Sequence, residues 1–184
     1  MTKYLVHILI LMAIAFVLVT VLNNQEHDEL PAFAQEDVIA KTHKAKISIK
    51  STSNVTPSLQ QLNYLQTDYS ALWAHLNHLY NTNNVEAGKE YYTEDFFKAI
   101  CKKQAPIRGI ISRKDKEHNI TITEWARDGL VCVGIDSNVV LEYQNAQNEK
   151  THTKATVAFA LLFQGEHWRL DAIQFLNEEK YTLE

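Results

Sequence analysis

Cysteine, proline and glycine are all scarce in this chain of 184 residues, which contains 2 Cys, 3 Pro and 5 Gly. So little proline and glycine argues against a disordered or fibrous protein. Two cysteines close at most one disulfide, which excludes a small scaffold held together by several bridges. Because 46% of the residues are hydrophobic, the chain can bury a core of its own, and its length suits one domain with an appendage.

Positive charge is also sparse. The chain has 18 Lys and Arg against 22 Asp and Glu, and its formal net charge is −4. Nucleic-acid binding needs concentrated positive charge against the phosphates, so nucleic acid is not an expected partner. Glycine-rich phosphate loops, nucleotide signatures and serine or cysteine nucleophile motifs are absent too. The sequence therefore predicts no cofactor and no metal, and it provides no catalytic motif.

One long apolar run stands out, from Tyr4 to Leu22, and it contains no Asp, Glu, Lys or Arg. About 19 helical residues just cover a hydrocarbon core of about 30 Å. Lys3 precedes the run and an acidic stretch follows it. The positively charged flank of a membrane segment stays on the cytoplasmic side. Residues 1–22 are therefore predicted to be a single-pass anchor in the inner or cell membrane, with the C-terminal domain outside the cytoplasm, in the periplasm.

A cleaved signal peptide is the alternative. Ala32-Phe33-Ala34 has the small-x-small form of a cleavage site, and cut there the protein would be secreted. The apolar run is longer than the usual signal-peptide core of about 7–15 residues, which favours the anchor. In both cases the domain is exported.

Residues 23–57 are polar, with few aromatic side chains and no helical period. We interpret them as a flexible polar linker. Thr42 to Ser53 alternates weakly, so an edge strand is the alternative there. Residues 58–184 are predicted to form the folded domain.

Leucine and aromatic residues between Ser58 and Tyr80 recur at spacings of three and four, which predicts an amphipathic helix. A short helical piece is expected from Val85 to Tyr91, and Thr93 is the expected N-cap of a further helix. Helices followed by hairpin-linked strands indicate an α+β fold with a mostly antiparallel sheet. The strands are expected at Asn119–Trp125, Leu130–Ile135, Val139–Tyr143, Thr153–Phe163 and His167–Leu176, with a turn at Asp136-Ser137-Asn138.

Three stretches resemble the NTF2-like (cystatin-like) superfamily. They are the helix end His78-Leu79-Tyr80-Asn81-Thr82, the helix entry Tyr91-Tyr92-Thr93-Glu94-Asp95-Phe96-Phe97, and the last hairpin from Ala158 to Asp171. The likeness covers about residues 58–178. It implies a long first helix, two shorter helices and a curved antiparallel sheet shaped as a cone, and it implies little about activity.

A single membrane helix followed by such a domain outside the inner membrane is similar, more weakly, to the VirB8-type components of bacterial secretion and conjugation machines. That resemblance implies an assembly scaffold and not an enzyme. It also implies protein partners, with self-association among them.

Glu124 is the single residue most suggestive of chemistry. Strict alternation places it on the same strand face as Ile120 and Ile122. If that face lines a cone, Glu124 is a carboxylate in an apolar pocket, with the raised pKa of a general base. The alternative is that Glu124, near a strand end, faces water or pairs with a nearby arginine.

Two further pairs of side chains are candidates. His167 and Asp171 share a strand face, which allows a His–Asp dyad in the cone or, as the alternative, a solvated pair on the sheet surface. Cys101 and Cys132 are the only cysteines, and an oxidising compartment permits a disulfide between them. Two unpaired thiols are the alternative.

His75 and His78 lie three residues apart on the long predicted helix, a spacing that can hold a metal. No third ligand is close in sequence. Both are therefore expected to be surface histidines.

Two functions follow from these patterns. The leading hypothesis is a non-enzymatic, membrane-tethered binding or scaffold module, because an anchor is present and no catalytic constellation is. The second is a small-molecule-binding or isomerase/dehydratase-type domain that uses a pocket carboxylate. A scaffold requires a filled or shallow cone and an exposed apolar patch, whereas an enzyme requires Glu124, or the His167 and Asp171 pair, inside a deep pocket.

Overall fold

The computed structural model describes residues 30–102 and 110–181. The chain divides into two compact units, Met1–Pro31 and Ala32–Glu184, and every described helix and strand belongs to the second. The predicted membrane segment, Tyr4–Leu22, lies outside the described residues. Within the described ranges no helix is both long and apolar enough to cross a membrane.

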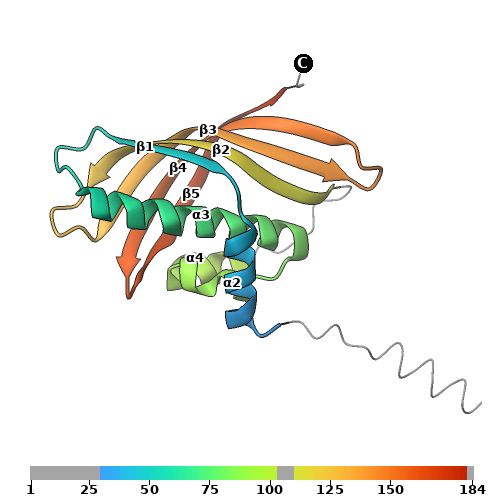
Figure 1. Ribbon diagram of the computed structural model, residues 1–184, viewed down its shortest axis with the longest axis horizontal. Coiled ribbons are helices and arrows are strands. Elements are labelled where there is room, and N and C mark those ends of the chain that lie inside the picture. The colour runs from blue at the N-terminus through green and yellow to red at the C-terminus, as the bar shows by residue number, and fades with distance from the viewer. Residues whose placement is uncertain (1–29, 103–109, 182–184) are drawn as a thin grey trace, which may run out of the picture. The chain divides into compact units, whose positions relative to one another are not determined.

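The second unit is an α+β fold in which helices precede a curved, mostly antiparallel sheet, as predicted. The strand order is β1-β2-β3-β4-β5. β1 runs parallel to β2, and every other neighbouring pair is antiparallel. Figure 1 shows the sheet curving over the long helix α3. The strands are β1 (Lys46–Ser51), β2 (Ile110–Trp125), β3 (Val131–Asn145), β4 (Lys150–Gln164) and β5 (His167–Tyr181).

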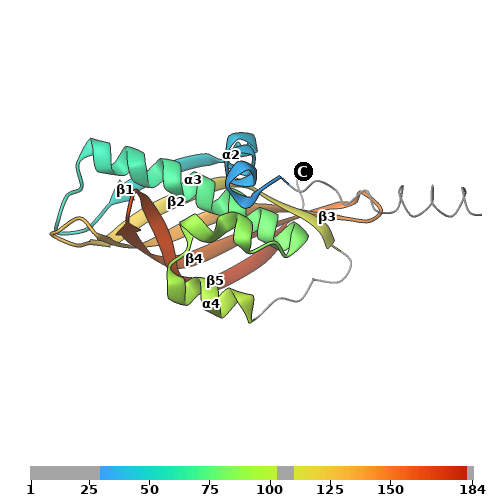
Figure 2. The same ribbon diagram turned by 90° about the horizontal axis from the view of Figure 1, so that it is seen from below.

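Side-chain caps mark the N-terminal ends of two of the helices. α3 (Leu59–Thr82) starts after Ser58, whose hydroxyl and the Gln61 side chain form a capping box. The 3-10 helix η1 (Glu86–Tyr91) follows, and α4 (Glu94–Cys101) is capped by the Thr93 hydroxyl, as predicted. Figure 2 shows α3 and α4 on the same side of the sheet.

Two predictions about local structure are corrected. Residues 32–51, expected to belong to a flexible linker, contain helix α2 (Ala32–Thr42), which was not predicted, and strand β1. The edge-strand alternative for Thr42 to Ser53 is therefore correct. Asp136-Ser137-Asn138, expected to be a turn, lies inside the continuous strand β3, where the pairing with β4 shifts between Asp136 and Val139. The residues at this irregularity are of types common in turns, but the direction of the strand does not change there.

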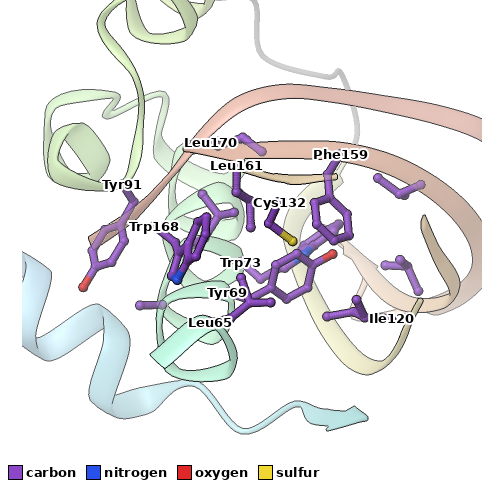
Figure 3. Close-up of a cluster of buried hydrophobic side chains, with 14 of the residues drawn as sticks. Leu65, Tyr69, Trp73, Tyr91, Ile120, Cys132, Phe159, Leu161, Trp168 and Leu170 are labelled. Carbon is purple, nitrogen blue, oxygen red and sulfur yellow. The ribbon is translucent and has the colours of Figure 1, made fainter. Parts of the chain in front are cut away.

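Aromatic and aliphatic side chains fill the space between α3 and the concave face of the sheet. Figure 3 shows Tyr69 and Trp73 from α3 pointing toward Phe159, Leu161 and Trp168 from the strands. Each of the five is at most 3% exposed. Their rings meet edge to face or tilted, which adds to the free energy of burial.

Candidate functional site

Glu124 does not face the core. The pairing of β2 with β3 shifts between Ile122 and Glu124. One extra residue on β2 reverses the alternation, so Trp125 follows Ile122 into the core and Glu124 is exposed. The prediction that Glu124 shares a face with the two preceding isoleucines is wrong, and its alternative, a carboxylate that faces water, is what the structure shows.

His167 and Asp171 do not form a dyad. His167 Nδ1 lies 3.1 Å from Asp68 Oδ1 on α3, and Asp68 Oδ2 accepts a hydrogen bond from the Trp168 backbone N–H. Asp171 is exposed and accepts a hydrogen bond from the Thr93 hydroxyl at 2.9 Å. Each side chain therefore ties β5 to a different part of the helical layer.

The two cysteines are free thiols in the structure. Cys101 is exposed at the end of α4, whereas Cys132 is fully buried on β3. Burial raises the pKa of the Cys132 thiol to about 12, so it stays protonated and behaves as a small hydrophobic side chain.

The polar centre of the domain is a buried series of carboxylates and imidazoles that the sequence did not reveal. His118 lies between Asp115 and Asp136, with its Nε2 2.8 Å from Asp115 Oδ2 and its Nδ1 2.6 Å from Asp136 Oδ2. The Tyr69 hydroxyl and the Asn119 backbone N–H also donate to Asp136. All three ionisable side chains of this series are at most 5% exposed. We call Asp115, His118 and Asp136 the His–Asp network.

The network continues toward the surface through Asp115. His43, in the connection after α2, places Nε2 2.5 Å from Asp115 Oδ2 and Nδ1 2.7 Å from Ser70 Oγ. The Asn77 amide donates to the other oxygen of Asp115, and Arg113 Nε donates to Asn77 Oδ1 at 2.9 Å. The segment that precedes β1 is thereby attached to the centre of the domain.

Hydrogen bonding outweighs burial in setting the charges of the network. Burial alone would raise the pKa of Asp115, but hydrogen bonds with His118 and His43 hold it well below its usual range. Burial alone would lower the pKa of His118, but hydrogen bonds with Asp115 and Asp136 raise it. Both shifts therefore favour an ionised Asp115 beside a protonated His118.

Serine, histidine and aspartate in the order Ser70, His43, Asp115 are the residue types of a hydrolytic triad. Such a triad also needs N–H donors for the developing oxyanion. Ser70 lies inside α3, where neighbouring N–H groups are already bonded along the helix. Both oxygens of Asp115 also accept hydrogen bonds, so the arrangement suits a structural tie better than a nucleophile.

His75 was expected on the surface and is instead 1% exposed. Its ring stacks on Tyr91 at 5.0 Å between centroids. Burial, with a smaller contribution from His78, lowers the pKa of His75 to about 4. No group of three or more potential metal ligands lies together within the described residues.

A groove of about 430 Å³ opens beside the network. Its walls are the end of α2 with the following connection, the second half of α3, and the first half of β2. β1 pairs with β2 only from Glu117 to Ile122, so the groove borders the stretch of β2 that β1 does not cover. His43 and Asp115 lie in its wall.

No protein-family model matches the chain, and a search of curated proteins also gives no match. The order of the elements and the curvature of the sheet are compatible with an NTF2-like cone. What the structure itself establishes is an α+β domain with a curved five-stranded sheet.

Sequence reasoning missed the network because its residues look like a solvated stretch. In a regular strand, Asp115 and His118 would point to opposite faces, since they are three residues apart. Pairing shifts on either side of Glu117 bring both side chains to the inner face. The one available signal is the alternation of basic and acidic side chains from Lys114 to Glu117, which has the two-residue period of a strand.

Proposed function

We propose that this protein is a membrane-tethered, exported binding or scaffold module, built on an NTF2-like domain, that acts in a bacterial envelope or secretion assembly. Residues 4–22 would hold it in the membrane, and its partners would be proteins of the same compartment. Tethering raises the effective concentration of weakly binding partners without any new contact.

The observation that supports this proposal most strongly is an exposed apolar surface on α2. Helix α2 contains no buried residue. Phe33 and Val38 on it are 77% and 49% exposed. We call Phe33 and Val38 the α2 stripe. Two large apolar side chains exposed on one short helix offer a site of protein or membrane contact.

The filled concave face also favours binding over catalysis. The side chains of α3 and the strands occupy the cone where a substrate pocket of this fold class would lie. Glu124, the residue on which the enzyme hypothesis depended, is exposed on the opposite face. The isomerase/dehydratase alternative therefore has no pocket acid among its candidates.

Site-specific photo-crosslinking in the full-length chain tests the proposal. A photoreactive residue at position 33, in the α2 stripe, should form a discrete adduct with one other membrane or envelope protein. The same residue at Leu59, which is 75% exposed at the start of α3, is the matched control and should form no such adduct.

The double substitution Phe33→Ser with Val38→Ser provides the second arm. Both side chains are exposed, so the free energy of unfolding should change by less than about 1 kcal/mol. Recovery of the adduct partner with this variant should fall by about tenfold or more, because the apolar contact area is lost. Unchanged recovery of that partner with the folded double variant would refute the proposal.

A further inference from the structure

The groove beside β2 has a charge opposite to that of the whole molecule. Four of its lining residues are cationic, Lys44, Arg113, Lys114 and Lys116, against one carboxylate, Asp115. The formal balance is four positive charges minus one negative, or +3, in a chain whose net charge is −4. A cleft lined by charges of one sign raises the local concentration of ions of the opposite sign.

The oxygens of the single carboxylate in the groove are already engaged by its neighbours. Asp115 accepts hydrogen bonds from Asn77 and lies within 2.8 Å of nitrogens of both His43 and His118. Because its oxygens are engaged, Asp115 offers no free cation ligand.

Among the described residues, three of the four cations have no ion pair. Lys116 Nζ lies 3.5 Å from Glu142 Oε1. Across residues 30–102 and 110–181, no carboxylate oxygen is placed within 4.0 Å of the charged nitrogens of Lys44, Arg113 or Lys114. Two exposed lysines without partners are ordinary, but a buried arginine that no described carboxylate contacts directly is not.

Arg113 is the residue of the groove whose side chain is held in a fixed position. Its side chain is held by the bond from Nε to Asn77 Oδ1 and by the face of the Tyr80 ring, 4.6 Å from the guanidinium carbon. Only 9% of Arg113 is exposed, so its charge is largely removed from water. A guanidinium fixed in orientation by packing matches the planar, two-oxygen geometry of a carboxylate or phosphate.

We propose that this groove binds a small-molecule oxyanion, with Arg113 as the fixed anchor and Lys44 and Lys114 as the flanking counter-charges. The bound group is a carboxylate or a phosphate. A volume of about 430 Å³ suits a small metabolite with one or two such groups. No residue of the α2 stripe lines this groove.

Titration of the full-length chain in detergent, with inorganic phosphate and with succinate as separate probes, tests the proposal. Saturable binding of at least one probe is expected, and it should weaken as salt is raised, because the attraction is screened. Saturation by phosphate alone identifies a phosphate site, and saturation by succinate alone identifies a carboxylate site.

Substitutions locate the binding. Lys44→Gln and Lys114→Gln should each weaken the affinity by about threefold to tenfold, and the double variant by more than tenfold. Lys98→Gln, an exposed lysine on α4, is the matched control and should have no effect. Arg113→Lys keeps the charge but loses the planar fork, so it should weaken binding further than either lysine variant.

Absence of saturable binding for both probes would overturn the proposal. So would equal weakening by Lys98→Gln and Lys114→Gln, since that would mean non-specific attraction. Neither outcome bears on protein binding through the α2 stripe, so the two proposals fail separately.

Discussion

At the scale of single residues, the polar side chains inside this domain follow two different rules. In the His–Asp network, every buried charge has an opposite charge or a hydrogen-bond donor beside it. His75 follows the other rule, since it is buried against Tyr91 with neither ring nitrogen hydrogen-bonded to a described group. Such a histidine is tolerated only in its neutral form.

His75 should therefore make the domain sensitive to acid. The unfolded chain binds a proton on this side chain near pH 6.5, whereas the folded chain does so only near a pKa of about 4. The contribution to stability is complete above pH 6.5 and is lost as the pH falls toward 4. The size of the loss is up to about 3 kcal/mol, from about 2.5 pK units.

His75→Phe keeps the stacked ring and removes the titration. The free energy of unfolding of this variant, measured by denaturant between pH 4 and pH 7, should fall less steeply with acid than that of the unchanged protein. Other acid-sensitive groups are present in both proteins, so only the difference between the two curves counts. Parallel curves would show that His75 does not titrate with folding.

At the scale of elements, long regular patterns were predictable and pairing irregularities were not. The leucine spacing from Ser58 placed the start of α3, and the cap at Thr93 placed that of α4, within two residues of the observed positions. The extra residues before Glu124 and after Asp136 have no sequence signal of their own, because a bulge is fixed by pairing with another strand. Each extra residue reverses which of the following side chains face the core. The fold was therefore predicted correctly, whereas the position of the candidate site was not.

One glycine shows how tightly β3 and β4 fit together. A Cβ atom on Gly134 would lie 2.6 Å from Phe159 Cζ and 3.1 Å from the Thr121 backbone oxygen. Because the backbone of a paired strand cannot move away easily from the added methyl group, Gly134→Ala should lower the free energy of unfolding by about 1–3 kcal/mol in chemical denaturation. Val133→Ala, on the opposite and more exposed face of β3, is the control and should cost less than about 1 kcal/mol. Equal effects of the two substitutions would contradict this packing.

At the scale of the whole molecule, the two thiols allow the proposed export of the domain to be tested. Cys101 is exposed and Cys132 is buried with a raised pKa, so the folded domain has one reactive thiol. A membrane-impermeant maleimide applied to intact cells should label the protein once, and Cys101→Ser should abolish the label. Labelling only after cell lysis would contradict export. No labelling of the denatured, unreduced protein would show that the thiols are joined.

We propose that the apolar segment Tyr4–Leu22 confines the domain to the membrane. The apolar, uncharged composition of that segment is the reason for proposing confinement. The exposed α2 stripe is the surface through which the confined domain would contact its partners. Confinement to two dimensions makes weak contacts productive, so releasing the domain should reduce partner binding even when the domain is unchanged. An enzyme acting on a soluble substrate would lose little by release and much by neutralisation of a catalytic acid.

The most direct test measures the yield of the adduct formed at position 33 in two exported forms of the chain at equal abundance. One form keeps residues 4–22, and the other has them replaced by a cleaved signal peptide. We expect the released form to give at least about tenfold less adduct, and Glu124→Gln in the tethered form to give an unchanged yield. An equal yield from the tethered and released forms would contradict the account.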